Sequence, residues 1–195
     1  QSAPLGSLGR LRDLANWLDF LPREFVDDNP RLLLYRYLTG RYTSSQAQLS
    51  SLQRAHRLFR EKNDLGGELE SLAYLIEAAV SRGCSSLPPM QSLTSQAESM
   101  LESLPSQGYG YERAVLWYQL GFAYYLRLGN PRKGYQACFN SYLLAKEYKD
   151  TPLQINALIH AYAALALLGE FPDAGRLVQR VERLLQKYRH VELRV

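Results

Sequence analysis

The chain has 195 residues, of which 46% are hydrophobic and 22% are charged, and its formal net charge is +4. This composition fits a folded domain with an ordinary core and excludes a disordered chain. No apolar run reaches the roughly 18 residues of a membrane-spanning helix, and residues 1–9 lack the pattern of a signal peptide. We therefore expect a protein that contacts no membrane.

The two cysteines, Cys84 and Cys138, lie far apart and belong to no paired motif. This spacing argues against a metal cluster or a dithiol redox site, and we expect both cysteines to be buried as small apolar residues. Without a disulfide signal, we expect a reducing, cytoplasmic location. The chain begins at Gln1, which indicates a fragment of a larger protein or a processed chain. We expect a tail over 1–7 and one helical domain over 8–195.

Apolar residues recur at intervals of three and four along most of the chain, which predicts helices rather than strands. Proline, serine and aspartate stand near the predicted helix starts, and Asn29 is expected to cap the helix that follows Pro30. The predicted helices of the first half cover 8–21, 31–39, 44–59 and 64–82. Those of the second half carry their apolar stripes over 97–104, 111–128, 131–148, 151–168 and 172–188.

Four glycines follow helical stretches at nearly even spacing: Gly40, Gly83, Gly129 and Gly169. We expect each to close a helix, because glycine adopts the left-handed backbone geometry of a helix end without a steric penalty. A period of about 40 residues indicates stacked helical hairpins. Short connections make neighbouring helices antiparallel. We expect an all-α superhelix of about nine antiparallel helices in four to five hairpins.

One segment carries a specific repeat signature. Trp117, Leu120, Gly121 and Tyr124 match the tetratricopeptide pattern W-x2-L-G-x2-Y in full, and Gly129 follows as the turn. The chain therefore resembles the tetratricopeptide class, which implies a right-handed superhelix. We expect the three large residues to form one packing stripe and Gly121 to let the next helix approach closely.

The resemblance extends to residues five, nine and twelve positions after three of the glycines. The residues at these offsets are Gly134, Cys138 and Ser141 after Gly129, then Ala174, Val178 and Val181 after Gly169, and Ser45, Leu49 and Leu52 after Gly40. We expect these small or apolar residues to face the interior of each hairpin.

The N-terminal segment resembles a second, narrower family. It reads W-L-D-F-L-P at 17–22, N-P-R-L-L-L at 29–34 and L-T-G-R-Y at 38–42. This block is similar to the helical sensor region of MalT-like, LuxR-type ATP-dependent transcriptional regulators. In that family the sensor lies between an NTPase with a winged-helix region and a DNA-reading domain. The chain has no G-x4-G-K-[ST] loop, so the resemblance implies the sensor arm alone, without assigning any effector-binding residue.

No motif indicates catalysis. His56, His160 and His190 do not share a metal-ligand spacing, and no serine or cysteine stands in a nucleophile motif. His160 lies among alanines, which favours a packed core histidine. The acidic pairs Asp27–Asp28 and Glu68/Glu70 are typical of loops and helix starts. We expect no enzyme activity, no metal and no cofactor.

The last 25 residues are basic. Arg176, Arg180, Arg183 and Lys187 share one face of a predicted helix. Such a face is compatible with nucleic-acid binding, but cations near a helix C-terminus are also typical of an ordinary solvated surface. We favour the second interpretation and expect no direct nucleic-acid contact.

The aromatic residues give the only indication of a binding site. The chain has 14 Tyr, 6 Phe and 2 Trp, and tyrosine combines an apolar ring with a hydroxyl, which suits recognition surfaces. The alternative is that aromatic residues fill the volume of lengthened repeats. The predicted binding residues are Tyr111, Tyr118 and Tyr125, with Arg113 and Arg127 as sources of charge-assisted contacts.

These features predict a recognition domain. The first hypothesis is the ligand- or partner-sensing region of a MalT-like, LuxR-type transcriptional regulator. The alternative is a scaffold that binds a peptide in a tetratricopeptide groove, and a third is a helical domain attached to an enzyme. The expected partner is a small effector, a protein or a peptide; oligomerisation of the full-length protein stays open.

Overall fold

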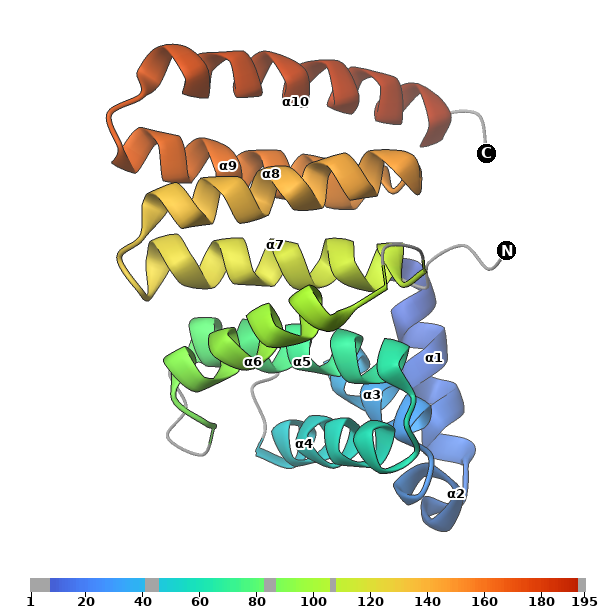
Figure 1. Cartoon of the computed structure of the whole chain (residues 1–195). Helices are drawn as coiled ribbons and strands as arrows, with labels where there is room; N and C mark the ends of the chain where they lie inside the picture. Colours follow the sequence, from blue (N-terminus) through green and yellow to red (C-terminus); the bar gives the residue numbers. More distant parts are fainter. Residues whose placement is uncertain (1–7, 41–45, 83–86, 106–107, 193–195) are drawn as a thin grey trace. The chain divides into compact units, whose positions relative to one another are not determined.

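A computed structural model describes residues 8–40, 46–82, 87–105 and 108–192 (Figure 1). These residues form ten helices and no strand, which confirms the all-α fold. The helices are α1 (Leu8–Phe20), α2 (Arg23–Asp27), α3 (Pro30–Gly40), α4 (Gln46–Glu61), α5 (Leu65–Arg82), α6 (Met90–Ser103), α7 (Gly110–Leu126), α8 (Pro131–Glu147), α9 (Thr151–Leu167) and α10 (Phe171–Glu192).

The chain divides into two compact units, residues 1–75 and residues 76–195, and the boundary falls inside α5. In the first unit α3 packs against α1, α2 and α4. The short helix α2, which the sequence did not predict, begins after Pro22 and buries Val26 completely. Leu34, Leu52 and Phe59 complete this core and are almost fully buried.

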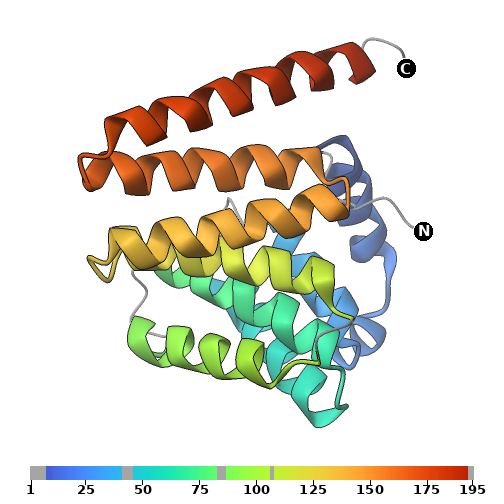
Figure 2. The ribbon, with the colours of Figure 1, turned by 45° about the horizontal axis from the view of Figure 1, so that its top comes forward.

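In the second unit the helices pack in the order of the sequence. Each of α6, α7, α8 and α9 contacts the helix that follows it, and α7 also contacts α9. Figure 1 and Figure 2 show α7 to α10 lying side by side in succession. This serial packing confirms the predicted helical repeat, while the hand of a superhelix stays a prediction.

The predicted close approach of two helices is confirmed at Gly121 of α7 and Gly134 of α8. A Cβ atom added at Gly121 would meet the Cys138 sulfur and would lie 2.9 Å from the Cys138 backbone nitrogen and 3.0 Å from the Gly134 carbonyl oxygen. A Cβ at Gly134 would lie 2.9 Å from the Cβ of Tyr125. Nearby, the Ser141 hydroxyl donates to the Ala114 carbonyl oxygen at 2.7 Å.

The predicted helix starts are confirmed by their caps. Asn29 Oδ1 accepts from the Arg31 backbone nitrogen at 3.0 Å, as expected for the start of α3. Asn130 Oδ1 accepts from Lys133 N at 3.1 Å at the start of α8. Asp150 Oδ1 accepts from Leu153 N at 2.9 Å at the start of α9.

Two of the four glycine turns have the expected geometry. Gly129 and Gly169 have positive φ angles of 62° and 76°. Helix α3 ends at Gly40 as predicted, but the left-handed geometry expected there is wrong, because this buried residue has no positive φ and packs against the side chain of Gln48. Gly83 lies outside the described residues.

The repeat offsets hold after Gly129, where Gly134, Cys138 and Ser141 are all buried. After Gly40, Leu49 and Leu52 are buried, and Ser45 lies outside the described residues. After Gly169 one prediction is wrong, since Val178 is 40% exposed while Leu177 is 5% exposed. The inward stripe of α10 is Ala174, Leu177, Val181 and Leu184. Cys138 is buried as expected, and Cys84 lies outside the described part of the chain.

Candidate functional site

Aromatic side chains from one face of α7 surround a histidine of α9. Tyr118, Phe122 and Tyr125 follow one another at intervals of four and three residues, which places them on the same side of the helix. The His160 ring centroid lies 5.3 Å from that of Tyr118, 4.7 Å from that of Phe122 and 5.9 Å from that of Tyr125. All four side chains are half-buried. We call these residues the α7–α9 face.

A hydrogen bond of 2.5 Å joins the Tyr125 hydroxyl to His160 Nδ1. Burial lowers the pKa of His160 below its ordinary value of 6.5, because a charged imidazolium would lose its hydration. Burial raises the pKa of Tyr125 to about 12. At neutral pH the bond therefore joins two uncharged groups.

The side chains of α7 and α9 that form this face carry no formal charge. Helix α9 contains no Asp, Glu, Lys or Arg, and the stripe of α7 that contacts it is aromatic. Helix α9 also leaves Ile159 and Leu167 exposed. Such a surface suits uncharged and apolar ligands, since it offers them ring faces and one hydroxyl–imidazole pair.

The two arginines predicted to join the tyrosines lie elsewhere, Arg113 on another side of α7 and Arg127 directly after the end of that helix. Arg113 donates to the carbonyl oxygen of Pro105 at 2.6 Å and to that of Leu104 at 3.3 Å. Arg127 donates through Nε to the carbonyl oxygen of Val80 at 2.8 Å. Each arginine thus binds the backbone near the end of a preceding helix. Arg127 lies two residues after Tyr125, and Arg113 lies five residues before Tyr118. At these offsets a helical side chain points away from the α7–α9 face.

Tyr111 is half-buried in the first turn of α7, two turns before Tyr118 on the same stripe. The structure therefore brings Tyr118 and Tyr125 together at His160, and extends their row along α7 to Tyr111. Trp117, Leu120, Gly121 and Tyr124 lie on the other sides of α7, where Leu120, Gly121 and Tyr124 are buried.

The sequence did not predict that His160 belongs to the aromatic cluster. Its alanine neighbours Ala157, Ala161 and Ala164 are buried as expected, but His160 is half-buried and contacts three aromatic rings. Phe122 was also missed. The three- and four-residue spacing of the aromatic residues on α7 could have identified Phe122, whereas no local signal identifies the contact to α9.

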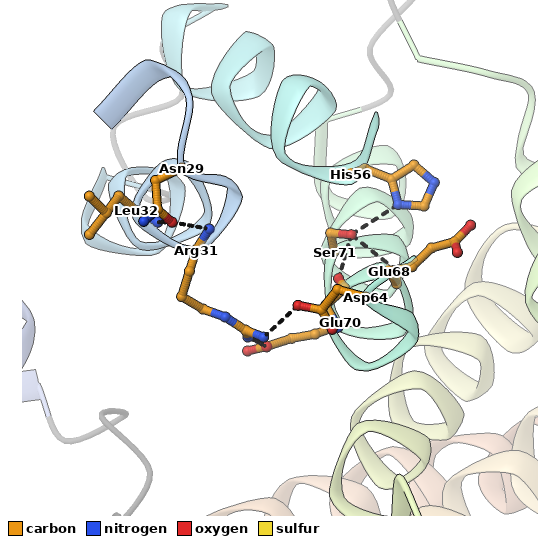
Figure 3. Close-up of polar contacts among 9 residues, drawn as sticks. Asn29, Arg31, Leu32, His56, Asp64, Glu68, Glu70 and Ser71 are labelled. Atoms are coloured by element: carbon orange, nitrogen blue, oxygen red, sulfur yellow. Dashed lines mark hydrogen bonds and ion pairs between the residues drawn. The ribbon is translucent and has the colours of Figure 1, made fainter. Parts of the chain in front are cut away.

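The first unit holds a second histidine in a polar cluster (Figure 3). His56 Nδ1 lies 2.9 Å from the Ser71 hydroxyl, and its Nε2 lies 3.3 Å from a guanidinium nitrogen of Arg60. Because arginine can only donate, Nε2 accepts and Nδ1 carries the hydrogen. Ser71 in turn donates to the Gly67 carbonyl oxygen at 2.7 Å and is fully buried. In this arrangement His56 donates to the serine and does not activate it as a nucleophile.

An ion pair in the same cluster connects α3 to the start of α5. Arg31 contacts Glu70 at 2.6 Å and Asp64 at 3.5 Å (Figure 3). Its guanidinium carbon also lies 5.0 Å from the centroid of the Phe59 ring, which is a cation–π geometry. These contacts hold helices of the first unit together and engage the Arg31 guanidinium within the protein.

In the described ranges, no three His, Cys, Asp or Glu side chains are grouped to hold a metal ion. Nor does any helix in the described part of the chain combine the length and the apolar character needed to cross a membrane. No family model matches the sequence, and no curated protein matches it.

Proposed function

We propose that this chain is a recognition domain whose α7–α9 face binds an uncharged effector or an apolar segment of a partner. The observation that carries the proposal is the ring cluster at His160, which joins Tyr118, Phe122 and Tyr125 within 6 Å between centroids. Aromatic rings with a hydroxyl offer a large contact area at a small entropic cost, and few polar groups then suffice to orient a ligand.

We further propose a role as the sensor region of a MalT-like, LuxR-type regulator, which would place the chain in the cytoplasm. This part depends on the sequence block at 17–42. Binding of an effector would shift the full-length protein between an inactive and an assembling form. Such a shift requires that the effector bind one form more tightly than the other.

The alternative is a scaffold that binds a peptide in a tetratricopeptide groove. The Trp117 to Tyr124 match supports it. A clamp for peptide carboxylates needs cations that are available for the ligand, whereas Arg113 and Arg127 donate to backbone carbonyl oxygens. If the groove binds a peptide, we expect an uncharged and apolar one.

The test is a thermal-shift screen of the purified chain against sugars, nucleotides and short peptides, followed by Tyr118→Ala. A ligand at a hundred times its Kd raises stability by about 2.7 kcal/mol. We expect Tyr118→Ala to reduce this shift and to keep most of the stability of the free protein. Tyr162→Ala is the matched control, because Tyr162 is an exposed tyrosine of α9 two residues from His160 and turned away from it.

Three results would contradict the proposal. The first is a ligand shift that Tyr118→Ala leaves intact. The second is a shift that the Tyr162→Ala control abolishes. The third is a collapse of the free protein on replacing Tyr118, which would make its ring part of the core.

A further inference from the structure

A small cleft of about 150 Å³ opens between α6, α7 and α8 in the second unit. Its lining side chains include Glu98 from α6, Trp117 and Tyr124 from α7, and Lys133, Gln136 and Asn140 from α8. This cleft is separate from the α7–α9 face, since Tyr124 and Tyr125 are successive residues of a helix and project about 100° apart.

The cleft already holds a cation of the chain itself. Glu98 Oε1 accepts from the Tyr124 hydroxyl at 2.5 Å and from Lys133 Nζ at 3.1 Å. The same ammonium group lies 5.3 Å from the centroid of the Tyr124 ring. A carboxylate beside an aromatic ring is the arrangement by which proteins bind ammonium and guanidinium groups.

The carboxylate at the centre of this site is ionised at neutral pH. The hydrogen bond from Tyr124 lowers the pKa of Glu98 below its ordinary value and outweighs the opposing effect of burial, and Lys133 lowers the pKa further. The Tyr124 hydroxyl keeps its proton, because burial and the neighbouring Glu98 raise its pKa. Glu98 therefore presents a negative charge that a phenol group holds in place.

Another cation can displace the Lys133 ammonium group from the Glu98 carboxylate. The Lys133 side chain is 55% exposed, its stem is flexible, and an exposed ion pair of this kind contributes little to stability. The cleft beside Lys133 still has room, and the rest of its lining is Trp117, Gln136, Ala137 and Asn140. The amides of Gln136 and Asn140 stand one helical turn apart on α8 and can both donate and accept.

We propose that this cleft binds a lysine or arginine side chain of a protein partner, which replaces Lys133 at the Glu98 carboxylate. The volume selects a side chain rather than a free metabolite, since small-molecule sites are typically about 300–1,000 Å³. A single carboxylate is too few ligands for Ca²⁺, which takes six to eight oxygen atoms. Gln136 and Asn140 supply hydrogen bonds for the backbone on either side of the inserted residue.

The test is an NMR titration of the whole chain that follows the indole N–H signal of Trp117, which Trp17→Phe distinguishes from the only other indole. The probes are the amides of N-acetyl-lysine and N-acetyl-arginine, and the neutral comparison is the amide of N-acetyl-norleucine. We expect the two basic probes to shift the signal and the neutral probe to leave it unchanged.

Two substitutions then locate the site. Glu98→Gln should abolish the shift, while the matched control Glu102→Gln, one turn further along α6, should preserve it. Lys133→Met should tighten binding by about two- to fivefold, because it removes a competing ammonium group that is held by an exposed ion pair.

A shift of equal size with the neutral probe would overturn the proposal, and so would retained binding in Glu98→Gln or weaker binding in Lys133→Met. If Glu98→Gln lowers the melting temperature strongly, its loss of binding could reflect unfolding. The proposal is then tested by the Lys133→Met titration, in which weaker binding would overturn it. Neither result bears on the α7–α9 face, because no residue of that face is changed.

Discussion

At the scale of single residues, the contact of Gly121 with α8 shows how a missing side chain can determine packing. Backbone atoms of Cys138 and Gly134 occupy the space that a Cβ at Gly121 would need. Backbone atoms cannot turn aside as a flexible side chain can. By contrast, a Cβ added at Gly175 of α10 would have no neighbour within 4 Å. Both glycines lie inside helices, but only at Gly121 does the packing of a neighbouring helix require the absence of a side chain.

We predict opposite effects of alanine at these two positions. Gly121→Ala should destabilise the protein by about 1–3 kcal/mol, because the added methyl group overpacks a close helix contact. Gly175→Ala should stabilise it by about 0.5–1 kcal/mol, because alanine restricts the unfolded chain and favours a helix. Urea unfolding of both variants measures the difference. Equal effects would show that α7 and α8 are not in close contact at Gly121.

At the scale of the elements, a left-handed residue follows four of the described helices, and only two of these four residues are glycine. Gly129 and Gly169 follow α7 and α9, whereas Asn63 follows α4 and Lys149 follows α8, with φ angles of 55° and 56°. A side chain with a Cβ pays a steric penalty in this region, which asparagine tolerates better than lysine. The turn after α8 therefore contains a strained lysine where the turns after α7 and α9 have glycine.

We predict that Lys149→Gly raises the free energy of unfolding by up to about 1 kcal/mol, because glycine removes the steric penalty at positive φ. Lys149→Ala serves as the control, since it removes the charge and keeps the Cβ. It should leave stability nearly unchanged. Thermal melting of the two variants measures the effect. If Lys149→Ala gains as much stability as Lys149→Gly, the gain comes from removing the charge and not from relieving the steric penalty.

At the scale of the whole molecule, each compact unit contains a histidine that burial keeps neutral. His56 belongs to the first unit and His160 to the second. Burial lowers the pKa of both below the ordinary value of 6.5, and at His56 the neighbouring Arg60 lowers it further. In the unfolded chain both rings take up protons at their ordinary pKa. Below that pH the unfolded chain therefore binds more protons than the folded one.

We predict that stability is fully present above pH 6.5 and declines as the pH falls from 6.5 toward the lowered pKa values of the folded state. The loss is at most about 1.4 kcal/mol per pH unit for each histidine. Urea unfolding at pH 7.5 and at pH 5.5 measures it, and His160→Gln should reduce the difference. Protonation of Glu98 lowers stability only in a separate pH range, below its ordinary pKa of 4.5. Equal stability at the two pH values would contradict the prediction.

All of the described helices except α2, the cap at Asn29 and the close approach at Gly121 could be predicted from local sequence. A helix repeats every 3.6 residues, so neighbours along the chain determine which side chains share a face, and a cap involves residues only two or three positions apart. The tyrosine stripe of α7 follows from the same rule. In α10 the repeat spacing predicted Val178 as an interior residue, whereas the buried residue is its neighbour Leu177. Repeat spacing alone does not determine which side of the last helix packs against the protein.

Only tertiary structure decided what the functional side chains meet. Tyr125 and His160 are 35 residues apart, as are Glu98 and Lys133, while Arg127 and the Val80 carbonyl oxygen are 47 residues apart. Such pairs depend on which helices become neighbours and on the rotation of each helix about its own axis. That rotation is set by the packing of all the surrounding side chains together, and no short stretch of the chain contains this information.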